Sequence, residues 1–571
     1  MDQLAGGTSA AIPAGDGDRI FSDRFEDRSH DAEDFARQVL ERFTYGARPE
    51  DISHFLSLGS NPEDRLAAWA TWQLDWHAIN DPELSARLSA ANYQTLDKSI
   101  TQLWADHVRG EMTNWPDRYR PVAETDAARI LRATYSRRQL YEMMVEFWHD
   151  HFNVAGWDFS IAPVFVQHDR DAIRPQALGN FRQMLEAVAK STAMLYYLDN
   201  RANRTGGYNE NWARELMELH TLGVDVYYPG ASHGAIPIGA DGQAIGYSDA
   251  DVYDVARCFT GWTVRNGHWQ FPPGPEYDTG EFFYFSNWHE GGQKNVLGQW
   301  VPLPGQPGGQ QEAHVVMDRL CTHPATARHI CRKLCRRYIS DDPPQSLVES
   351  AASVWLENWQ EPDQVARVML HIMTSDEVLN GQGAKIRRPF EMVIATLRKT
   401  AAEIEPRHFG EWAPYGEFFS RFQQTGHGSF RWPAPDGYPD TAQRWTSVSV
   451  MGQSWRLLSR LPELRYPDGG AFLLRIHELT VQAFPNPSQH TAANLVDWWL
   501  TRLIGRPVSA LRRQELIDFL RQNAAADAPL DIVDNAPYGN WSQNNLSAHY
   551  TPVRLRAMVS LITMLPEFHQ R

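Results

Sequence analysis

Apolar side chains recur at helical spacing along most of this chain, and this periodicity constrains the fold more than any other feature. Phe35, Val39 and Phe43 repeat every four residues, as on the buried face of a helix that ends before Gly46. An Asn-Pro-Glu-Asp sequence at 61–64 supplies a cap, a first-turn proline and an acidic start for another helix. Further helices are expected at 127–134, 137–150, 179–197, 210–221, 249–260, 312–320, 324–338, 346–357, 362–373, 385–403, 446–460, 490–504, 509–523 and 550–564. The pattern predicts a mainly α protein with a large multi-helix globular fold.

Two stretches depart from this pattern. Residues 263–302 place Trp269, Phe271 and Trp288 among Gly, Pro and Asn residues, which predicts a small β-rich excursion. Residues 405–445 are also rich in Gly, Pro and aromatic residues, and the aromatic content favours a long ordered loop.

The length of 571 residues is several times that of a usual domain, so the chain can bury a large core. We expect a flexible N-terminal arm at 1–30, because it is rich in Gly, Ala and Asp and lacks helical periodicity. The arm also lacks the basic start and apolar centre of an export signal, so none is expected as the chain is written. Residues 31–571 are expected to form one helical domain, or subdomains 31–262 and 303–571 around the β-rich insert.

Charge and composition narrow the classes of partner. The chain has 54 basic and 70 acidic side chains and a formal charge of -16, which argues against nucleic acid as a partner. Its apolar runs are far shorter than the roughly 20 residues needed to cross a bilayer, so no membrane span is expected. The 21 Trp residues fit either a large core or a glycan-handling site, because aromatic faces stack on sugar rings.

Four cysteines are too few for a disulfide framework in a chain of this length. Cys331 and Cys335 are four residues apart, with Cys321, His323 and His329 nearby, so a zinc site is one reading. Free buried cysteines, including Cys258, are the other reading, and we favour it.

Four segments occur together in an order that resembles the domain of unknown function 1800 family. The segments are 43–49 (FTYGARP), 147–154 (FWHDHFNV), 209–225 (NENWARELMELHTLGVD) and 258–263 (CFTGWT). Weaker similarity extends over 323–327 (HPATA), 385–391 (KIRRPFE) and 432–435 (WPAP) with Trp445. The resemblance therefore covers most of the chain beyond residue 35.

This resemblance implies a largely helical protein without an established activity. Members often carry an export signal and are often encoded beside a sulfatase-like protein, which suggests such a protein as a partner. The chain departs from the family pattern by an insertion-like stretch at 227–245.

The third segment places a charged face on a helix from about 210 to 222, with Gly223 as a left-handed C-terminal cap. One sector of this helix carries Asn211, Arg214, Glu215 and Glu218. The face either meets water, with an Arg214–Glu218 pair, or lines a cleft.

In a cleft, Glu215 would be the general acid or base, because a neighbouring charge or burial keeps a carboxyl protonated. Glu218 and Asp225 are the candidate second carboxylates, and Asp150 and Glu290 are further alternatives. Asn211 and Arg214 would contact the substrate. The tryptophans expected to stack on sugar are Trp262, Trp269, Trp288, Trp432 and Trp445.

His149 and His151 resemble a metal-ligand pair, but on a continuous helix they point about 200° apart. Only if the helix ends at Trp148 do they face the same way, and then His220 or Glu215 would complete a site for zinc or another divalent ion. Otherwise His151 is expected to point inward.

Three hypotheses about function follow. The first is an enzyme that cleaves a polysaccharide by carboxylate acid/base catalysis. The second is a non-catalytic binding or assembly partner of a secreted sulfatase-like protein, and the third is a metal-dependent hydrolase that uses the His149/His151 pair. The sequence contains no nucleotide-binding or serine-hydrolase motif in a supporting context.

Overall fold

The computed structural model describes most of the chain. It covers residues 32–110, 115–240, 242–302, 309–381, 384–407, 414–464, 474–532 and 546–571. The expected arm at 1–30 lies outside these residues. Within them helices dominate, and the strands form two small two-stranded sheets, so the mainly α class is confirmed.

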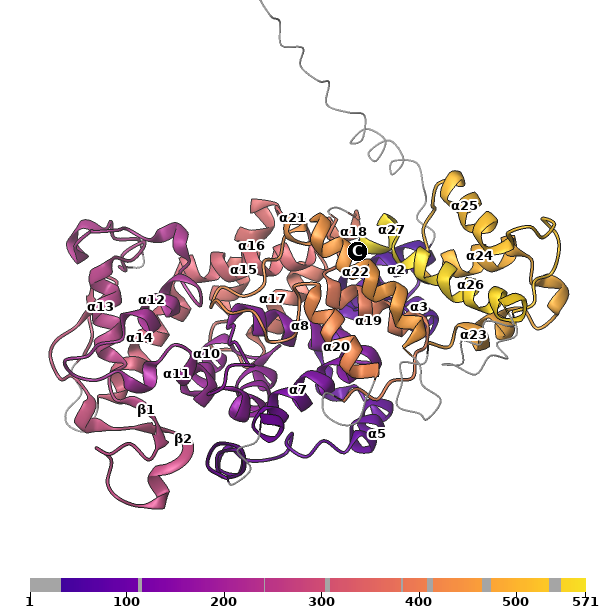
Figure 1. The fold of residues 1–571 in the computed structure, drawn as a ribbon. Coiled ribbons are helices and arrows are strands. Elements are labelled where there is room, and N and C mark those ends of the chain that lie inside the picture. Colours follow the sequence, from indigo (N-terminus) through magenta and orange to yellow (C-terminus); the bar gives the residue numbers. More distant parts are fainter. Residues whose placement is uncertain are drawn as a thin grey trace, which may run out of the picture.

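The N-terminal part of the chain forms a run of helices that ends beside the central motif. They are α2 (Ala32–Phe43), α3 (Pro49–Ser57), α4 (Pro62–Leu74), α5 (Pro82–Ala91), α6 (Ile100–Leu103), α7 (Trp115–Tyr135), α8 (Gln139–His151), α9 (Phe165–Gln167), α10 (Phe181–Lys190) and α11 (Thr192–Tyr197). In Figure 1, α8 lies near the middle of the molecule.

The central part carries both sheets. Its helices are α12 (Glu210–Glu218), α13 (Asp249–Cys258), α14 (Gln310–Thr322), α15 (Pro324–Tyr338), α16 (Gln345–Glu357), α17 (Gln364–Met373), α18 (Asp376–Leu379) and α19 (Pro389–Lys399). Strand β1 (Trp262–Asn266) pairs antiparallel with β2 (Asp278–Tyr284), and β3 (Asn295–Val296) pairs with β4 (Gln299–Trp300). The β-rich excursion predicted for 263–302 is therefore confirmed.

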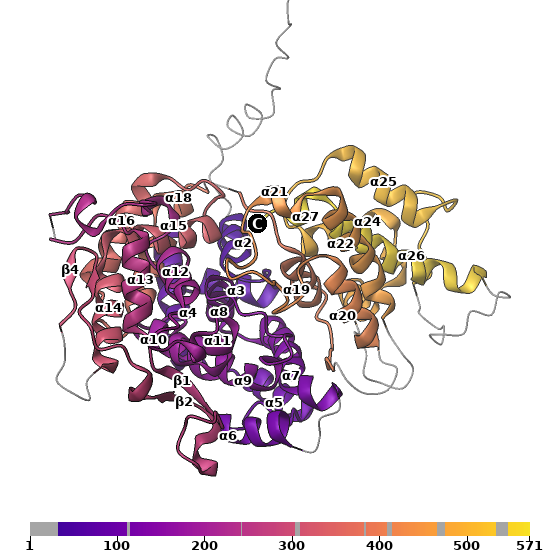
Figure 2. The ribbon, with the colours of Figure 1, turned by 60° about the vertical axis from the view of Figure 1, so that its left-hand side comes forward.

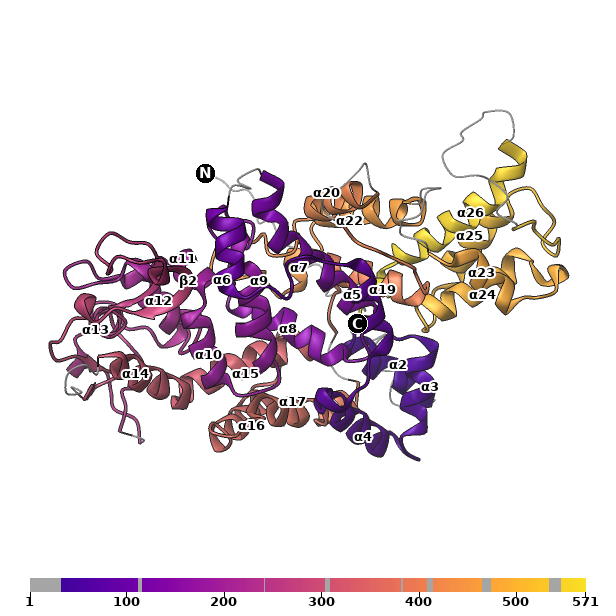
Figure 3. The ribbon, with the colours of Figure 1, turned by 90° about the horizontal axis from the view of Figure 1, so that it is seen from below.

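The C-terminal part completes the fold. Its helices are α20 (Pro414–Gln424), α21 (Ala442–Trp445), α22 (Val448–Arg460), α23 (Ile476–Ala483), α24 (Ala492–Leu503), α25 (Ala510–Arg521), α26 (Leu546–Thr563) and α27 (Pro566–His569). Figures 1, 2 and 3 all place α24 to α26 at one end of the molecule and α12 to α14 at the other, with α8 and α19 between them.

Local signals explain several helix boundaries. Asn61 caps α4 by accepting a hydrogen bond from the Asp64 N–H at 2.8 Å, and Pro62 occupies the first turn, as predicted. Helix α8 begins at Gln139 without a side-chain cap, because the Ser136 hydroxyl donates to Asp81 and Arg138 precedes the first helical residue.

One hydrophobic core runs through the molecule and includes side chains from Phe35 to Phe568. Burial of this apolar surface is the main force holding the helices together. A smaller cluster of Phe271, Phe285 and Trp288 supports the β1/β2 hairpin. Within the described residues, no helix has the length and apolar character that a membrane crossing requires.

Buried ion pairs connect α8 to α15 and α19. Arg388, which precedes α19, contacts both Glu146 and Asp150 on α8. Nη2 of Arg337 in α15 lies 2.7 Å from Oε1 of Glu391 in α19. Although burial raises a carboxyl pKa, the surrounding guanidinium charges, Arg388 foremost, lower the pKa of Glu146 to about 2.

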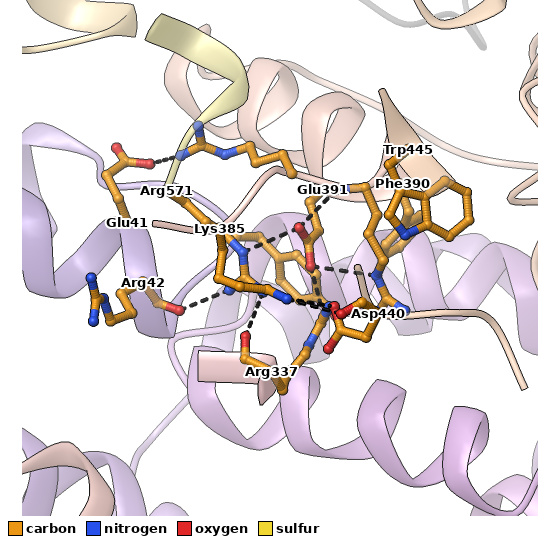
Figure 4. Close-up of polar contacts among 12 residues, drawn as sticks. Glu41, Arg42, Arg337, Lys385, Phe390, Glu391, Asp440, Trp445 and Arg571 are labelled. Atoms are coloured by element: carbon orange, nitrogen blue, oxygen red, sulfur yellow. Dashed lines mark hydrogen bonds and ion pairs between the residues drawn. The ribbon is translucent and has the colours of Figure 1, made fainter. Parts of the chain in front are cut away.

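The same network reaches the C-terminal residues and the segment after Gly437. Figure 4 shows Arg337, Lys385, Glu391, Asp440 and Arg571 gathered around one point. Lys385 Nζ lies 3.3 Å from Asp440, and Arg571 Nε lies 3.3 Å from Glu391. The Arg571 guanidinium also donates to the Arg337 carbonyl at 3.0 Å. The network therefore joins segments that are distant in the sequence.

Replacing Arg388 by Met is expected to lower the free energy of unfolding by about 3–5 kcal/mol, because the buried Glu146 and the half-buried Asp150 lose their shared cation. Urea unfolding measures this change. Arg513→Met is the matched control, since Arg513 forms an exposed bidentate pair with Asp497 and such pairs contribute little. An equal loss in both variants would contradict the assigned role of Arg388.

Candidate functional site

Helix α12 presents the charged face predicted from the sequence. Asn209 caps it, because its side-chain oxygen accepts from the Trp212 N–H at 3.0 Å. The opposite face is buried and consists of Trp212, Ala213, Leu216 and Met217. Glu215 and Glu218 are half-buried at the boundary between core and solvent. The helix ends at Glu218 with Leu219 as its C-cap, so the prediction of Gly223 as a left-handed cap is wrong; Gly223 lies four residues further on, with φ +89° and ψ +159°.

Glu215 has the most perturbed carboxyl on this face. Burial and the charges of Glu218 and Asp436 raise its pKa to about 7, while Arg214 acts in the opposite direction. A carboxyl with this pKa holds a proton near neutral pH and releases it readily, which suits acid/base chemistry.

Arg214 pairs with a different residue from the one that the sequence suggested. It pairs with Asp249 of α13 at 2.9 Å and not with Glu218. Asp249 also accepts from the Tyr227 hydroxyl at 2.5 Å and from the Gly230 N–H at 3.1 Å. These hydrogen bonds lower the pKa of Asp249 to about 2. Arg214 therefore fixes α12 to α13 and to the insertion-like stretch, and Glu218 is left without this cation.

A cavity of about 560 Å³ opens at the start of α12. Its lining residues are Tyr197, Leu198, Asp199, Ala202, Gly207, Tyr208, Asn209, Glu210 and Asn211. Asn211 lies one helical turn before Glu215, so the cavity and the raised-pKa carboxyl share one helix face. A second cavity of about 510 Å³ is lined by Ala67, Ala68, Thr71, Trp72, Asp75 and Ala78 and offers fewer convergent polar groups.

The segment 431–437 contacts Tyr197, which lines the cavity, and we call the cavity with this adjoining segment the cleft. The Asn153 side chain, just after α8, donates to the carbonyls of Trp432 at 3.0 Å and Ala434 at 2.7 Å. The Tyr197 hydroxyl donates to the Pro433 carbonyl at 2.8 Å. Burial is the main reason that the pKa of Tyr197 rises to about 12, and the nearby charges of Glu215 and Asp436 add to it. Three of the recognised sequence segments thus meet here.

Asp436 is the residue that the sequence analysis missed. It is exposed, accepts from the Trp432 indole N–H at 2.7 Å and raises the pKa of Glu215 by its charge. The signal was present in the Asp436-Gly437 turn directly after the WPAP segment. Asp225, predicted as a second carboxylate, is instead 73% exposed and pairs with Arg332 at 2.9 Å.

The other alternative carboxylates are engaged elsewhere. Asp150 contacts Arg388, and Glu290 pairs with Arg257 at 2.8 Å. Neither is available as the partner of Glu215 in this arrangement.

The predicted metal ligands do not converge. Helix α8 continues to His151, so His149 and His151 point to different neighbours. His149 Nε2 lies 2.9 Å from Asp169, whereas His151 Nε2 contacts the His220 carbonyl at 3.1 Å. The described part of the chain contains no group of three His, Cys, Asp or Glu side chains arranged to hold a metal ion. The pair therefore cannot act as the shared ligand set that the sequence suggested, because the helix separates the rings.

All four cysteines are free and buried, which agrees with the reading favoured from the sequence. Burial raises the pKa of each thiol, and this disfavours the thiolate that a metal would need.

The predicted sugar-stacking tryptophans divide into two groups. Trp262, Trp288 and Trp445 are buried and offer no free ring face, which corrects that expectation for them. Trp262 packs against Phe259 and Phe282. Trp432 is half-buried beside the cleft, and Trp269 on the β-rich excursion is 82% exposed.

Comparison with known proteins gives one match. The model of a family described as protein of unknown function (DUF1800) matches residues 38–570. No curated protein and no solved structure matches the chain. The family resemblance of the sequence segments is therefore confirmed, and it brings no assigned reaction with it.

Gly437 positions the segment that carries Asp436. Its φ is +72°, and a Cβ there would lie 1.9 Å from the Asp150 carbonyl oxygen. Gly437→Ala is expected to cost about 2 kcal/mol or more of unfolding free energy, from backbone strain plus the clash. Gly206→Ala is the control, because Gly206 has φ +77° but nothing within 4 Å of its Cβ. Chemical unfolding of both variants tests this, and equal losses would show that the Asp150 contact is unimportant.

Proposed function

The chain belongs to the protein of unknown function (DUF1800) family, and from the cleft beside α12 we propose that it is an enzyme that cleaves a polysaccharide. Glu215 is the proposed general acid. The observation that carries the proposal is its half-buried carboxyl, whose pKa is raised to about 7 and which lies one helical turn after Asn211 in the cavity wall.

Acid/base cleavage of a glycosidic bond needs two carboxyl groups in different protonation states. Glu215 supplies the protonated group near neutral pH. Glu218 and Asp436 are the candidates for the ionised partner, because both act on Glu215 by their charge. Glu218 lies on the adjacent turn of the same helix, near the lower limit of the carboxyl separation that such enzymes use, which is roughly 5 Å. Asp436 comes from a separate segment, so we propose it as the second carboxylate.

The cavity has the chemistry that a sugar requires. Tyr197 and Tyr208 supply aromatic rings, and Asn211 supplies an amide group that can donate to and accept from hydroxyls. Trp432, half-buried beside Asp436, is the proposed stacking residue within the cleft. Trp269 is a more distant candidate for contact with a long chain. Arg214 is proposed as a positioning residue, since its guanidinium is engaged with Asp249.

The proposal predicts that Glu215→Gln lowers kcat on the responsive polysaccharide by roughly a hundredfold or more, because the proton donor is lost. Reducing-end and unsaturated-sugar assays over a polysaccharide panel provide the measurement. Asp225→Asn is the matched control, since this carboxylate is exposed and paired with Arg332, and its kcat should stay near that of the parent.

The proposal also predicts how the catalytic activity changes with pH. The acid must be protonated, so activity is expected to fall as pH rises through about 7, the pKa of Glu215. A folded parent protein that leaves every polysaccharide unchanged, or a Glu215→Gln variant with full activity, would contradict the proposed function.

A non-catalytic binding or assembly role with a sulfatase-like protein is the second candidate. The observation in its favour is a group of exposed apolar side chains, Ile238, Ile245 and Trp300. They lie close together, because Ile238 bridges to Ala244 and approaches Gly298 in the β3/β4 hairpin. Exposed apolar groups of this kind mark interaction surfaces.

This second role predicts a different pattern of variants. Trp300→Asp should abolish capture of the sulfatase-like protein in a pull-down, because it places a charge in the apolar surface, while Glu215→Gln should bind normally. If the Trp300→Asp variant still captures the sulfatase-like protein, the proposed role of this apolar surface in binding is wrong.

A further inference from the structure

Lys333 differs from every other lysine in the chain. The sequence has six lysines, at 98, 190, 294, 333, 385 and 399. Five of them pair with a carboxylate: Lys98 with Asp106 at 2.8 Å, Lys190 with Glu186, Lys294 with Glu312 at 2.6 Å, Lys385 with Asp341 at 2.6 Å and Lys399 with Glu41 at 2.6 Å. Among the described residues, no carboxylate forms an ion pair with Lys333. Its Nζ instead donates to His151 Nδ1 at 2.9 Å.

The hydrogen bonds of His151 fix which nitrogen carries the proton. Nε2 contacts the His220 carbonyl at 3.1 Å, and a carbonyl oxygen only accepts, so Nε2 is the protonated nitrogen. Nδ1 therefore presents its lone pair to Lys333. His151 is 1% exposed, which keeps this tautomer and ring position in place. Burial, followed by the positive charge of Lys333, lowers the pKa of His151 well below its usual value, so the neutral imidazole accepts a hydrogen bond from the Lys333 amine.

The surroundings of Lys333 favour the neutral amine. Burial is the largest cause, and with Arg336 it lowers the pKa of Lys333 to about 8, although Asp150, Asp440 and Asp436 act in the opposite direction. His220 and His329 also face this group, and burial lowers the pKa of His220 to about 3 and that of His329 to about 4. Both imidazoles are therefore neutral near neutral pH. Lys333 as a whole residue is half-buried.

We propose that Lys333 and His151 form a nucleophilic pair that captures a small aldehyde or ketone as an imine. The neutral amine of Lys333 attacks the carbonyl carbon, and the C=O π electrons move to oxygen. His151 Nδ1 transfers one proton from the attacking nitrogen to that oxygen, which gives a carbinolamine. The nitrogen lone pair then expels the hydroxyl group, which takes the remaining N–H proton and leaves as water, and a C=N bond forms. The amine and the carbonyl compound yield imine and water, and no oxidant or reductant is required for capture. This inference does not depend on polysaccharide cleavage.

Reductive trapping on the full-length protein tests the pair. Glycolaldehyde with cyanoborohydride converts an imine into a stable hydroxyethyl-lysine, and peptide mass spectrometry reports labelling at each of the six lysines. An amine with a pKa of about 8 holds roughly a hundredfold more neutral form at about pH 7.5 than an ordinary lysine. Lys333 is therefore expected to label at least about tenfold faster than Lys98, allowing for its partial burial.

Lys98 is the internal control because it also contacts an imidazole, His107 Nε2, at 3.0 Å, but is paired with Asp106. Lys333→Arg should remove the fast label, and Lys98→Arg should leave it unchanged. His151→Phe, which keeps a ring among Phe147, Trp148 and Phe152, should slow labelling of Lys333 about tenfold or more.

If His151→Phe does not fold, the pH dependence of Lys333 labelling in the parent protein tests the proposal. Labelling of Lys333 should rise with a midpoint near 8. Labelling of Lys333 that is no faster than that of Lys98, or a midpoint near the ordinary lysine value of about 10.4, would overturn the proposal.

Discussion

The buried ion pairs around Arg388 and Arg337 are the constraint on which the rest of the structure depends. Glu146 and Asp150 come from α8, Glu391 begins α19, and the Asp440 segment and Arg571 approach from later in the chain. Charges placed in an apolar core are tolerated only when their partners are held in position. This requirement sets the end of α8 and the path of the chain after Gly437, which adjoin Asn153 and the 431–437 segment.

Two reactive groups result from this positioning. Asn153 extends from the end of α8 and holds the backbone of Trp432 and Ala434, which brings Asp436 within electrostatic reach of Glu215. On the neighbouring helix α15, Lys333 contacts His151 of α8. The charge of Asp436 acts on the pKa of both Glu215 and Lys333, so the 431–437 segment connects the acidic cleft to the lysine. Stability and chemistry thus share the same few elements.

Local patterns predicted much of the fold. The periodicity gave α15 with the same bounds as the structure, and the polar face of α12 was placed correctly. Helix α5 was missed although Pro82 stands at its first turn and Asn92 at its left-handed end, because its apolar pattern is weak. Pro121 inside α7 similarly obscured the first part of that helix. The site was predicted only in part, since Asp249, Asp436 and Lys333 reach it through tertiary contacts that no local spacing encodes.

The protonation of Glu215 is the central claim, and its pKa can be measured directly. Carboxyl ¹³C NMR of the parent protein, with Glu215→Gln to assign the signal, follows this group through the pH range. The account predicts a midpoint near 7, which falls when Asp436→Asn or Glu218→Gln removes a neighbouring negative charge. A midpoint at the ordinary glutamate value of about 4.3, unchanged in both variants, would contradict it.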